Sequence, residues 1–133
     1  MKLLLAAFLA AHALIHTSYL SPSPAQAAGA PEWPFEFARS WLVTALGLDP
    51  AAVRAMGIAL VAGTVVVLIA AALATAGWII PTEWWAVLAA SGAISSLLTL
   101  TLFFHPWLLL GFAIDAALLV AVFSGWRPFA MGA

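Results

Sequence analysis

The chain contains no cysteine, and this absence excludes several kinds of chemistry. Thiol–disulfide exchange, cysteine-ligated zinc and iron–sulfur clusters all need thiol or thiolate groups. Charged residues are also scarce, at 7% of 133 positions, whereas an ordinary soluble domain has about 25%. The net charge is −1 without a basic cluster, which argues against nucleic acid as a partner. The sequence has no phosphate-binding loop, nucleophile elbow or dinucleotide-binding glycine motif, so we expect no enzyme activity.

Apolar residues dominate what is present, at 66% of the chain. Such a chain cannot cover a soluble surface, and its natural partner is the lipid bilayer. Apolar runs at about 3–20, 52–76, 83–104 and 106–124 are each close to the roughly 20 residues that a membrane-spanning helix needs. The prediction is an all-α, integral membrane four-helix bundle in a single domain, 1–133.

Local motifs mark the ends of these spans. The Asp49-Pro50 pair is typical of a helix N-terminus, and Gly77 is typical of the residue that ends one. We expect Thr82 to cap the third span, and a break at His105-Pro106, because proline disfavours helical geometry in the residue before it. All seven tryptophans fall in connections or at span ends, where indole rings favour the membrane interface: Trp33, Trp41, Trp78, Trp84, Trp85, Trp107 and Trp126.

The segment 21–50 is predicted to be an extramembrane loop, because prolines crowd its first half. Within it, 35–48 places Phe37, Trp41 and Leu42 near one side and Arg39 and Ser40 toward the other. This pattern favours a short amphipathic helix in the headgroup region between spans one and two. An ordinary loop helix packed on the bundle is the alternative.

The first span has a second interpretation as a cleaved signal peptide, since Ala25-Gln26-Ala27 resembles a signal peptidase site. The apolar run extends past His12 and His16, which favours a retained helix. An even number of spans places both termini on one side. The positive charges are balanced, with Lys2 and Arg127 facing one way and Arg39 and Arg54 the other; we expect cytoplasmic termini.

Asp115 lies inside the fourth apolar run. It is about nine residues, or roughly 14 Å, from the predicted helix start, near the middle of a hydrocarbon layer about 30 Å thick. A carboxylate at that depth costs several kcal/mol unless it is partnered, protonated or hydrated, and it therefore marks a candidate functional site. His12 lies about as deep in the first span, so the two side chains are predicted to pair.

Other polar residues extend this predicted centre. His16 is one turn from His12 on the same face, Ser95 and Ser96 lie near the middle of span three, and Thr64 is at similar depth. The two histidines have the spacing of two metal ligands, but such residues in a bundle more often satisfy one another, and we expect no metal site.

Packing alone also accounts for part of this pattern. Hydroxyl and small residues at four-residue spacing occur wherever membrane helices pack closely, and their hydrogen bonds contribute about 0.6 kcal/mol each. The plain interpretation of Asp115 and His12 is a buried pair that only holds the bundle in register. His105 is interpreted as an interfacial turn residue. A haem or chlorophyll-type pigment held by His12, His16 or His105 stays open, because one histidine suffices as an axial ligand.

Three sequence segments carry a resemblance to a known group of proteins: A-H-A-L-I-H at 11–16, G-A-I-S-S-L at 92–97, and H-P-W-L-x-x-G-x-x-I-D-x-A-L-L at 105–119, followed by Gly-Trp-Arg-Pro. The chain resembles small, uncharacterised four-span membrane proteins of bacteria, and is loosely similar to the DoxX-like group in size and span count. The resemblance implies a four-helix membrane bundle and carries no activity.

The leading functional expectation is a non-enzymatic accessory or structural subunit of a larger membrane complex, or a homo-oligomer. A small transporter or proton-relay protein is the alternative, with Asp115 as the titrating carboxyl and His12 and His16 beside it. Cofactor binding through a histidine is the third possibility.

Overall fold

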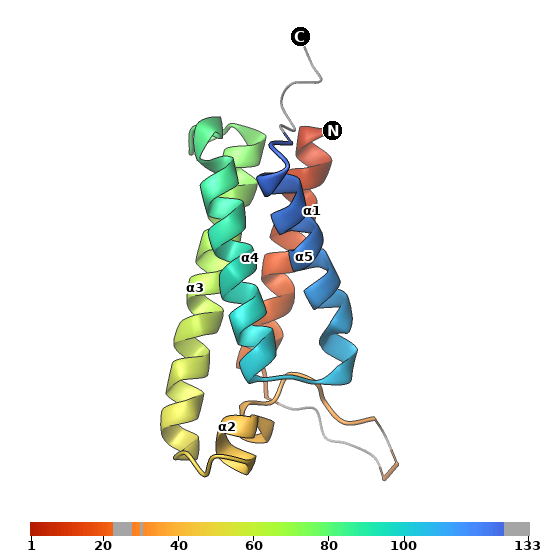
Figure 1. Ribbon diagram of the computed structural model, residues 1–133, viewed down its shortest axis with the longest axis vertical. Coiled ribbons are helices and arrows are strands. Elements are labelled where there is room, and N and C mark those ends of the chain that lie inside the picture. Colours follow the sequence, from red (N-terminus) through yellow and green to blue (C-terminus); the bar gives the residue numbers. More distant parts are fainter. Residues whose placement is uncertain (23–27, 30, 127–133) are drawn as a thin grey trace.

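The computed structural model describes residues 1–22, 28–29 and 31–126, and every regular element in this part of the chain is helical (Figure 1). Four helices form the bundle: α1 (Lys2–His16), α3 (Pro50–Ala76), α4 (Trp85–Leu102) and α5 (Leu109–Phe123). Short 3-10 turns extend three of them: η1 (Thr17–Leu20) follows α1, η3 (Thr82–Trp84) precedes α4, and η4 (Pro106–Leu108) precedes α5. The resulting four segments are long and apolar enough to cross a membrane, which confirms the predicted all-α four-helix bundle.

The four helices run alternately down and up, so that α1 begins and α5 ends at the same end of the bundle (Figure 1). The closely packed pairs are α1 with α3, α3 with α4, and α4 with α5. Helix α5 buries only Asp115 and Leu118 among its 15 residues, and most of its surface is free of the bundle. The proposed cleavage site at 25–27 and Arg127 lie outside the described residues.

The predicted N-terminus of the second span is confirmed. The Asp49 carboxylate accepts a hydrogen bond from the Ala52 N–H at 2.8 Å, Pro50 is the first helical residue, and Gly77 ends α3 in a left-handed conformation at φ 73°. The prediction that Thr82 caps the third span is wrong. Pro81 is the extended residue before the η3 turn, so the turn starts with Thr82 inside it and makes no side-chain cap.

The predicted helix over 35–48 is shorter than expected. It consists of a 3-10 turn, η2 (Phe37–Arg39), and the four-residue α2 (Trp41–Thr44), separated by the extended Ser40. Ser40 was expected to face away from the apolar side, but it is 1% exposed and donates to the Leu102 carbonyl at 2.7 Å. The Trp41 indole donates to the Thr101 carbonyl at 3.0 Å.

These two bonds explain why the segment docks under the bundle. The last carbonyls of α4 have no partner within their own helix, and the two side chains supply donors for them. The segment is thus packed against the end of the bundle, as in the second of the two interpretations.

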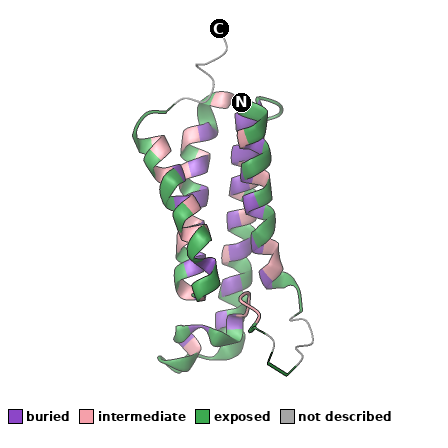
Figure 2. Cartoon of the chain, turned by 90° about the vertical axis from the view of Figure 1, so that its right-hand side faces the viewer, coloured by how far each residue is buried: buried purple, intermediate pink, exposed green. Residues whose placement is uncertain are grey.

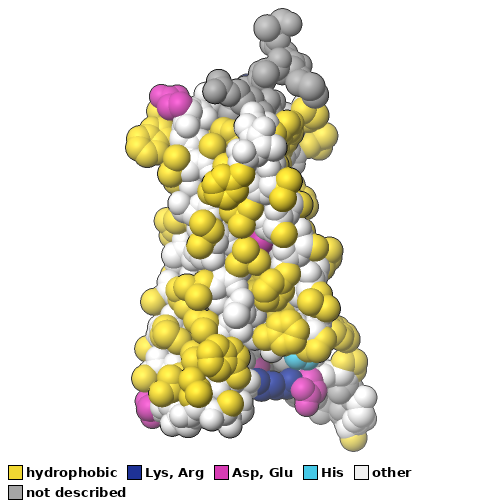
Figure 3. Space-filling model, in the orientation of Figure 1, with side chains coloured by type: hydrophobic (Ala, Val, Ile, Leu, Met, Phe, Trp, Pro, Cys, Tyr) yellow, Lys and Arg dark blue, Asp and Glu magenta, His cyan; other side chains and the backbone are white. Residues whose placement is uncertain are grey.

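The buried core consists of two apolar clusters with a polar layer between them. One cluster gathers around Leu9, Leu68 and Ala93, and the other around Tyr19 and Leu100. Most buried polar residues of the four helices lie in sequence near the junction of the two clusters: His12 and His16 on α1, Thr64 on α3, Ser96 and Thr99 on α4, and Asp115 on α5. Thr75 of α3 lies within the first cluster instead. Figure 2 shows buried residues alternating with exposed ones along the helices. On the face shown in Figure 3, apolar side chains are spread along the length of the bundle wall, and charged side chains lie mainly near its ends.

Candidate functional site

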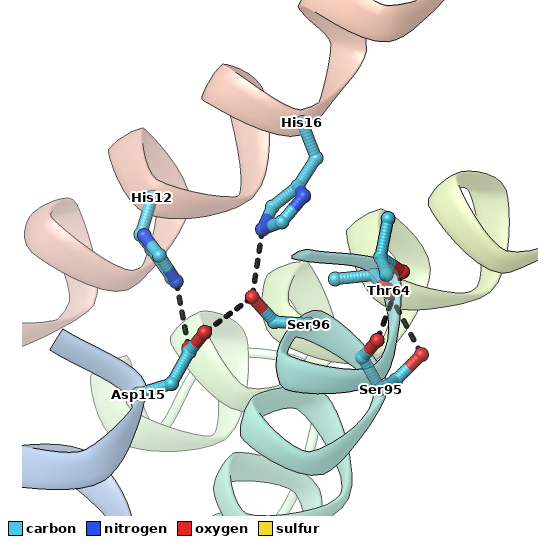
Figure 4. Close-up of polar contacts among 7 residues, drawn as sticks. His12, His16, Thr64, Ser95, Ser96 and Asp115 are labelled. Carbon is cyan, nitrogen blue, oxygen red and sulfur yellow. Dashed lines mark hydrogen bonds and ion pairs between the residues drawn. The ribbon is translucent and has the colours of Figure 1, made fainter. Parts of the chain in front are cut away.

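Asp115 is the centre of the polar layer. It extends from α5 into the bundle and is 0% exposed. Its Oδ1 lies 2.8 Å from His12 Nε2, and its Oδ2 accepts a hydrogen bond from the Ser96 hydroxyl at 2.5 Å (Figure 4). The pairing of His12 with Asp115 that their depths predict is therefore present. One carboxylate connects α1, α4 and α5.

His16 extends this arrangement by one residue. Its Nε2 lies 2.9 Å from the Ser96 hydroxyl oxygen, so an unbroken hydrogen-bonded chain runs from His12 through Asp115 and Ser96 to His16 (Figure 4). The two histidines are four residues apart on α1, which places them on the same face. Their rings meet edge to face at 5.4 Å between centroids. We call these four residues the polar network.

The direction of the hydrogen bonds in the polar network follows from the single hydroxyl hydrogen of Ser96. Ser96 donates to Asp115, so its oxygen can only accept from His16, and His16 carries a hydrogen on Nε2. A neutral imidazole with Nε2–H has an acceptor lone pair on Nδ1. That atom is buried and has no hydrogen-bond partner among the described residues.

Ser95 and Thr64 form a separate contact. Their hydroxyl oxygens lie 2.7 Å apart and join α4 to α3 (Figure 4). Ser95 was predicted as part of the same centre as Ser96, but consecutive residues of a helix point about 100° apart. The structure therefore places Ser95 against α3 and only Ser96 in the polar network.

His105 lies away from these side chains, at the start of the last span. It is partly exposed, and its Nδ1 accepts the Trp107 N–H at 3.2 Å, so it caps the η4 turn. Its ring also lies edge to face with Trp107, at 6.3 Å between centroids. His105 is thus a turn residue, as the plain interpretation expected; its place at the membrane interface stays a prediction.

A pocket of about 120 Å³ lies between α1 and α5 beside the polar network. Both imidazoles line it, and the rest of its wall is largely apolar: Ile15, Phe35, Leu100, Trp107, Leu108, Leu110, Gly111 and Ile114. Pockets for drug-sized ligands usually measure about 300–1,000 Å³, so a haem or chlorophyll does not fit inside it. Among the residues that the structure describes, no group of three or more metal-ligating side chains comes together.

The other end of the bundle offers no comparable polar path among the described residues. Beyond the polar network the buried cluster around Leu9, Leu68 and Ala93 is apolar. Thr75, a buried hydroxyl in that half, donates to the Ala71 carbonyl within its own helix at 2.7 Å. The pocket between α1 and α5 is lined by both histidines of the polar network.

Sequence reasoning identified every member of the polar network, but it predicted neither bond of Ser96, to Asp115 or to His16. The available signal was the four-residue spacing of His12 and His16, which places both side chains on the same face of α1. Comparison with protein-family models, with curated proteins and with solved structures yields no match for this chain.

Proposed function

We propose that this is a small, non-enzymatic membrane protein that relays protons between His16 and the buried carboxyl of Asp115. The observation that carries the proposal is the unbroken hydrogen-bonded chain from His16 through Ser96 to Asp115. Chains of histidine and acidic side chains inside a membrane are the usual components of proton relays.

The polar network supports a balanced proton transfer. A proton that reaches Nδ1 of His16 makes that ring an imidazolium. Its Nε2 proton then passes to the Ser96 oxygen, which lies 2.9 Å away. At the same time the Ser96 hydroxyl proton passes to Asp115 Oδ2, which lies 2.5 Å from the Ser96 oxygen. His16 is neutral again with its hydrogen on Nδ1, and Asp115 is protonated. His12, bonded to Oδ1 at 2.8 Å, stabilises the carboxylate before the transfer.

An acid-jump experiment on protein in lipid nanodiscs tests this proposal. The infrared carbonyl band of a protonated carboxyl should appear in the wild-type chain and be missing in Asp115→Asn. The difference between these two spectra isolates Asp115 from the other acidic residues. In proteoliposomes the same variant should abolish any proton flux that the protein supports.

Ser96→Ala and Ser95→Ala provide a matched pair for the same experiment, because each removes one hydroxyl from neighbouring positions of α4. We expect the band to appear about tenfold more slowly, or slower still, in Ser96→Ala, since general acid–base partners typically change rates by a factor of 10² or more. Ser95→Ala should keep the wild-type rate. Equal rates in both variants would rule out the route through Ser96. A wild-type spectrum without the band at any pH would leave His12 and Asp115 a purely structural pair.

A second candidate, an accessory subunit of a larger membrane complex, is favoured by α5. This helix buries only two of its residues in the bundle, and it leaves large apolar side chains such as Leu110 and Val120 exposed. Purification from native membranes in mild detergent should then recover larger subunits together with the chain. Recovery of the chain alone would contradict this role.

The same proposal places the protein in a bacterial inner membrane with both termini in the cytoplasm. The absence of cysteine makes this straightforward to test, since each cysteine introduced is the only thiol in the chain. A cysteine at Lys2 should be protected from a membrane-impermeant thiol reagent in intact cells, and one at Glu32 should react. The reverse pattern would overturn the orientation.

A further inference from the structure

Helices α1 and α5 lie side by side without close packing. The closely packed pairs of the bundle are α1 with α3, α3 with α4, and α4 with α5, and two hollows lie along the line between α1 and α5. One is the pocket of about 120 Å³ described above, and the other is a hollow of about 350 Å³ whose wall includes Phe8 of α1 and Ala117 of α5. Ile114 lines both of them. We call this line, with its two hollows, the α1–α5 seam.

A single polar contact joins the two sides of the seam. Among the hydrogen bonds made by the described residues, only the one between His12 Nε2 and Asp115 Oδ1, at 2.8 Å, connects α1 to α5 (Figure 4). Helix α5 also has the least other packing: 17% of the last span is buried inside the bundle, compared with 33–39% of the other three spans. The attachment of α5 to α1 therefore depends on this contact.

The strength of this contact depends on the charge of Asp115. A hydrogen bond to an ionised group is about twice as strong as one between neutral groups. An ionised carboxyl inside a membrane also requires partners, whereas a neutral carboxyl is far less costly to leave without them. Protonation of Asp115 thus weakens the contact with His12 and removes most of the penalty for breaking it.

Few groups face Asp115. His12 and His16 reach the polar network from α1, and Ser96 reaches it from α4. Helix α4 has no titratable residue, and Arg54, near the start of α3, is the only one of that helix. Asp115 is the only titratable residue of α5 itself. The charge at the seam is therefore set by Asp115 and the two histidines.

We infer that Asp115 controls the α1–α5 seam: its carboxylate holds α5 against α1 through His12, and its protonation lets α5 move away and opens the seam. Helix α5 stays on α4, because Gly111 permits a close approach to Leu100 that involves no charge; a methyl group on Gly111 would lie 2.9 Å from Leu100 Cδ1. The inference rests on the proposed function, in which Asp115 receives a proton, and adds that this proton changes the arrangement of the helices.

Pulsed electron–electron resonance between two spin labels measures the seam directly. The chain has no cysteine, so labels attach only to the cysteines introduced. Leu4→Cys with Val120→Cys places one label on α1 and one on α5, at positions that are 77% and 69% exposed. Val66→Cys with Ile94→Cys is the matched control, because both positions are exposed and α3 and α4 are closely packed. Both pairs are measured in lipid nanodiscs over a range of pH.

On acidification, we expect the long-distance population of the seam pair to grow relative to the short-distance one by about tenfold or more. The change should have the same pH midpoint as the infrared carbonyl band of Asp115, and the control pair should keep its distance. Asp115→Asn, which has a neutral side chain of the same shape, should give the long distance at every pH. The shared midpoint tests the inference in the native chain even if this variant does not fold.

A seam distance that stays constant while the Asp115 band appears would refute the opening and leave the proton relay standing. Equal changes in both label pairs would also refute it, because they would show a general loosening of the bundle at low pH. If the wild type shows no band at any pH, the relay fails and Asp115→Asn alone decides the inference. A short seam distance in that variant then refutes control by Asp115, and a long one supports it.

Discussion

Replacing Ser96 with alanine is the sharpest test of the polar network's contribution to stability. The hydroxyl of Ser96 takes part in two buried hydrogen bonds, one to Asp115 at 2.5 Å and one from His16 at 2.9 Å. Its removal leaves the Nε2–H of His16 without a partner and takes one donor from the carboxylate. The variant is therefore expected to lose stability on two counts.

The magnitude follows from the two bonds. A hydrogen bond to a charged group contributes about 1.5–3 kcal/mol, and a buried donor left unsatisfied costs about 1–3 kcal/mol. These values are not additive, and interhelical hydrogen bonds in membranes average only about 0.6 kcal/mol, with a maximum near 1.7. Two interhelical bonds of about 0.6 to 1.7 kcal/mol each lead us to expect that Ser96→Ala lowers the free energy of unfolding by about 1–3 kcal/mol. Ser95→Ala removes a single contact with Thr64 and should cost about 0.6 kcal/mol.

The assay is reversible unfolding in mixed micelles of a mild detergent and SDS, followed by circular dichroism. The two serine variants and the wild type are measured under the same conditions. The differences between their unfolding free energies then do not depend on extrapolation to zero SDS. A difference of less than about 0.5 kcal/mol between Ser96→Ala and Ser95→Ala, which is within ordinary non-additivity, would refute the reasoning. It would mean that the polar network's hydrogen bonds do not hold α1, α4 and α5 together.

Two further substitutions test the packing and the helix ends, by the same unfolding measurement. In Gly92→Ala the new methyl carbon would lie 2.6 Å from Leu68 Cδ2 and 2.9 Å from its Cγ. The buried Leu68 side chain or the helices must therefore shift, and stability should fall by about 1–3 kcal/mol. Gly63→Ala, which meets nothing within 4 Å, should be neutral or stabilising by up to about 1 kcal/mol, and equal effects of the two variants would contradict the close packing at Gly92. Asp49→Ala removes the cap of the Ala52 N–H and should cost about 1 kcal/mol, with faster hydrogen exchange confined to the first turn of α3; unchanged exchange there would show that the cap contributes nothing.

The features that the sequence predicts correctly are those set by neighbouring residues. Apolar runs long enough for a bilayer predict four spans, because no soluble arrangement covers so much apolar surface. The start of α3 at Pro50 and its end at Gly77 follow from a side-chain cap and a left-handed glycine, both of which act within one turn of helix. Thr82 shows the limit of this reasoning, since the turn starts directly after Pro81 and Thr82 lies inside it without capping it.

For the polar centre, the sequence predicts how deep each side chain lies in the membrane, but not which side chains meet. Counting 1.5 Å per residue brings His12 and Asp115 to the same level, and a carboxyl inside a membrane requires a partner. The count says nothing about how each helix is rotated about its axis. Rotation is decided by the packing of α1 on α3, α3 on α4 and α4 on α5.

Tertiary structure therefore decided which polar groups meet. It directs Ser96 to Asp115 and His16, and its neighbour Ser95 to Thr64. It also breaks the segment 35–48 at Ser40, because the final carbonyls of α4 need donors from another part of the chain. Such contacts join residues far apart in sequence, where a local pattern carries no information. The sequence by itself determined a membrane bundle with a buried carboxyl, and only the packing of the helices made that carboxyl part of a hydrogen-bonded network beside a pocket.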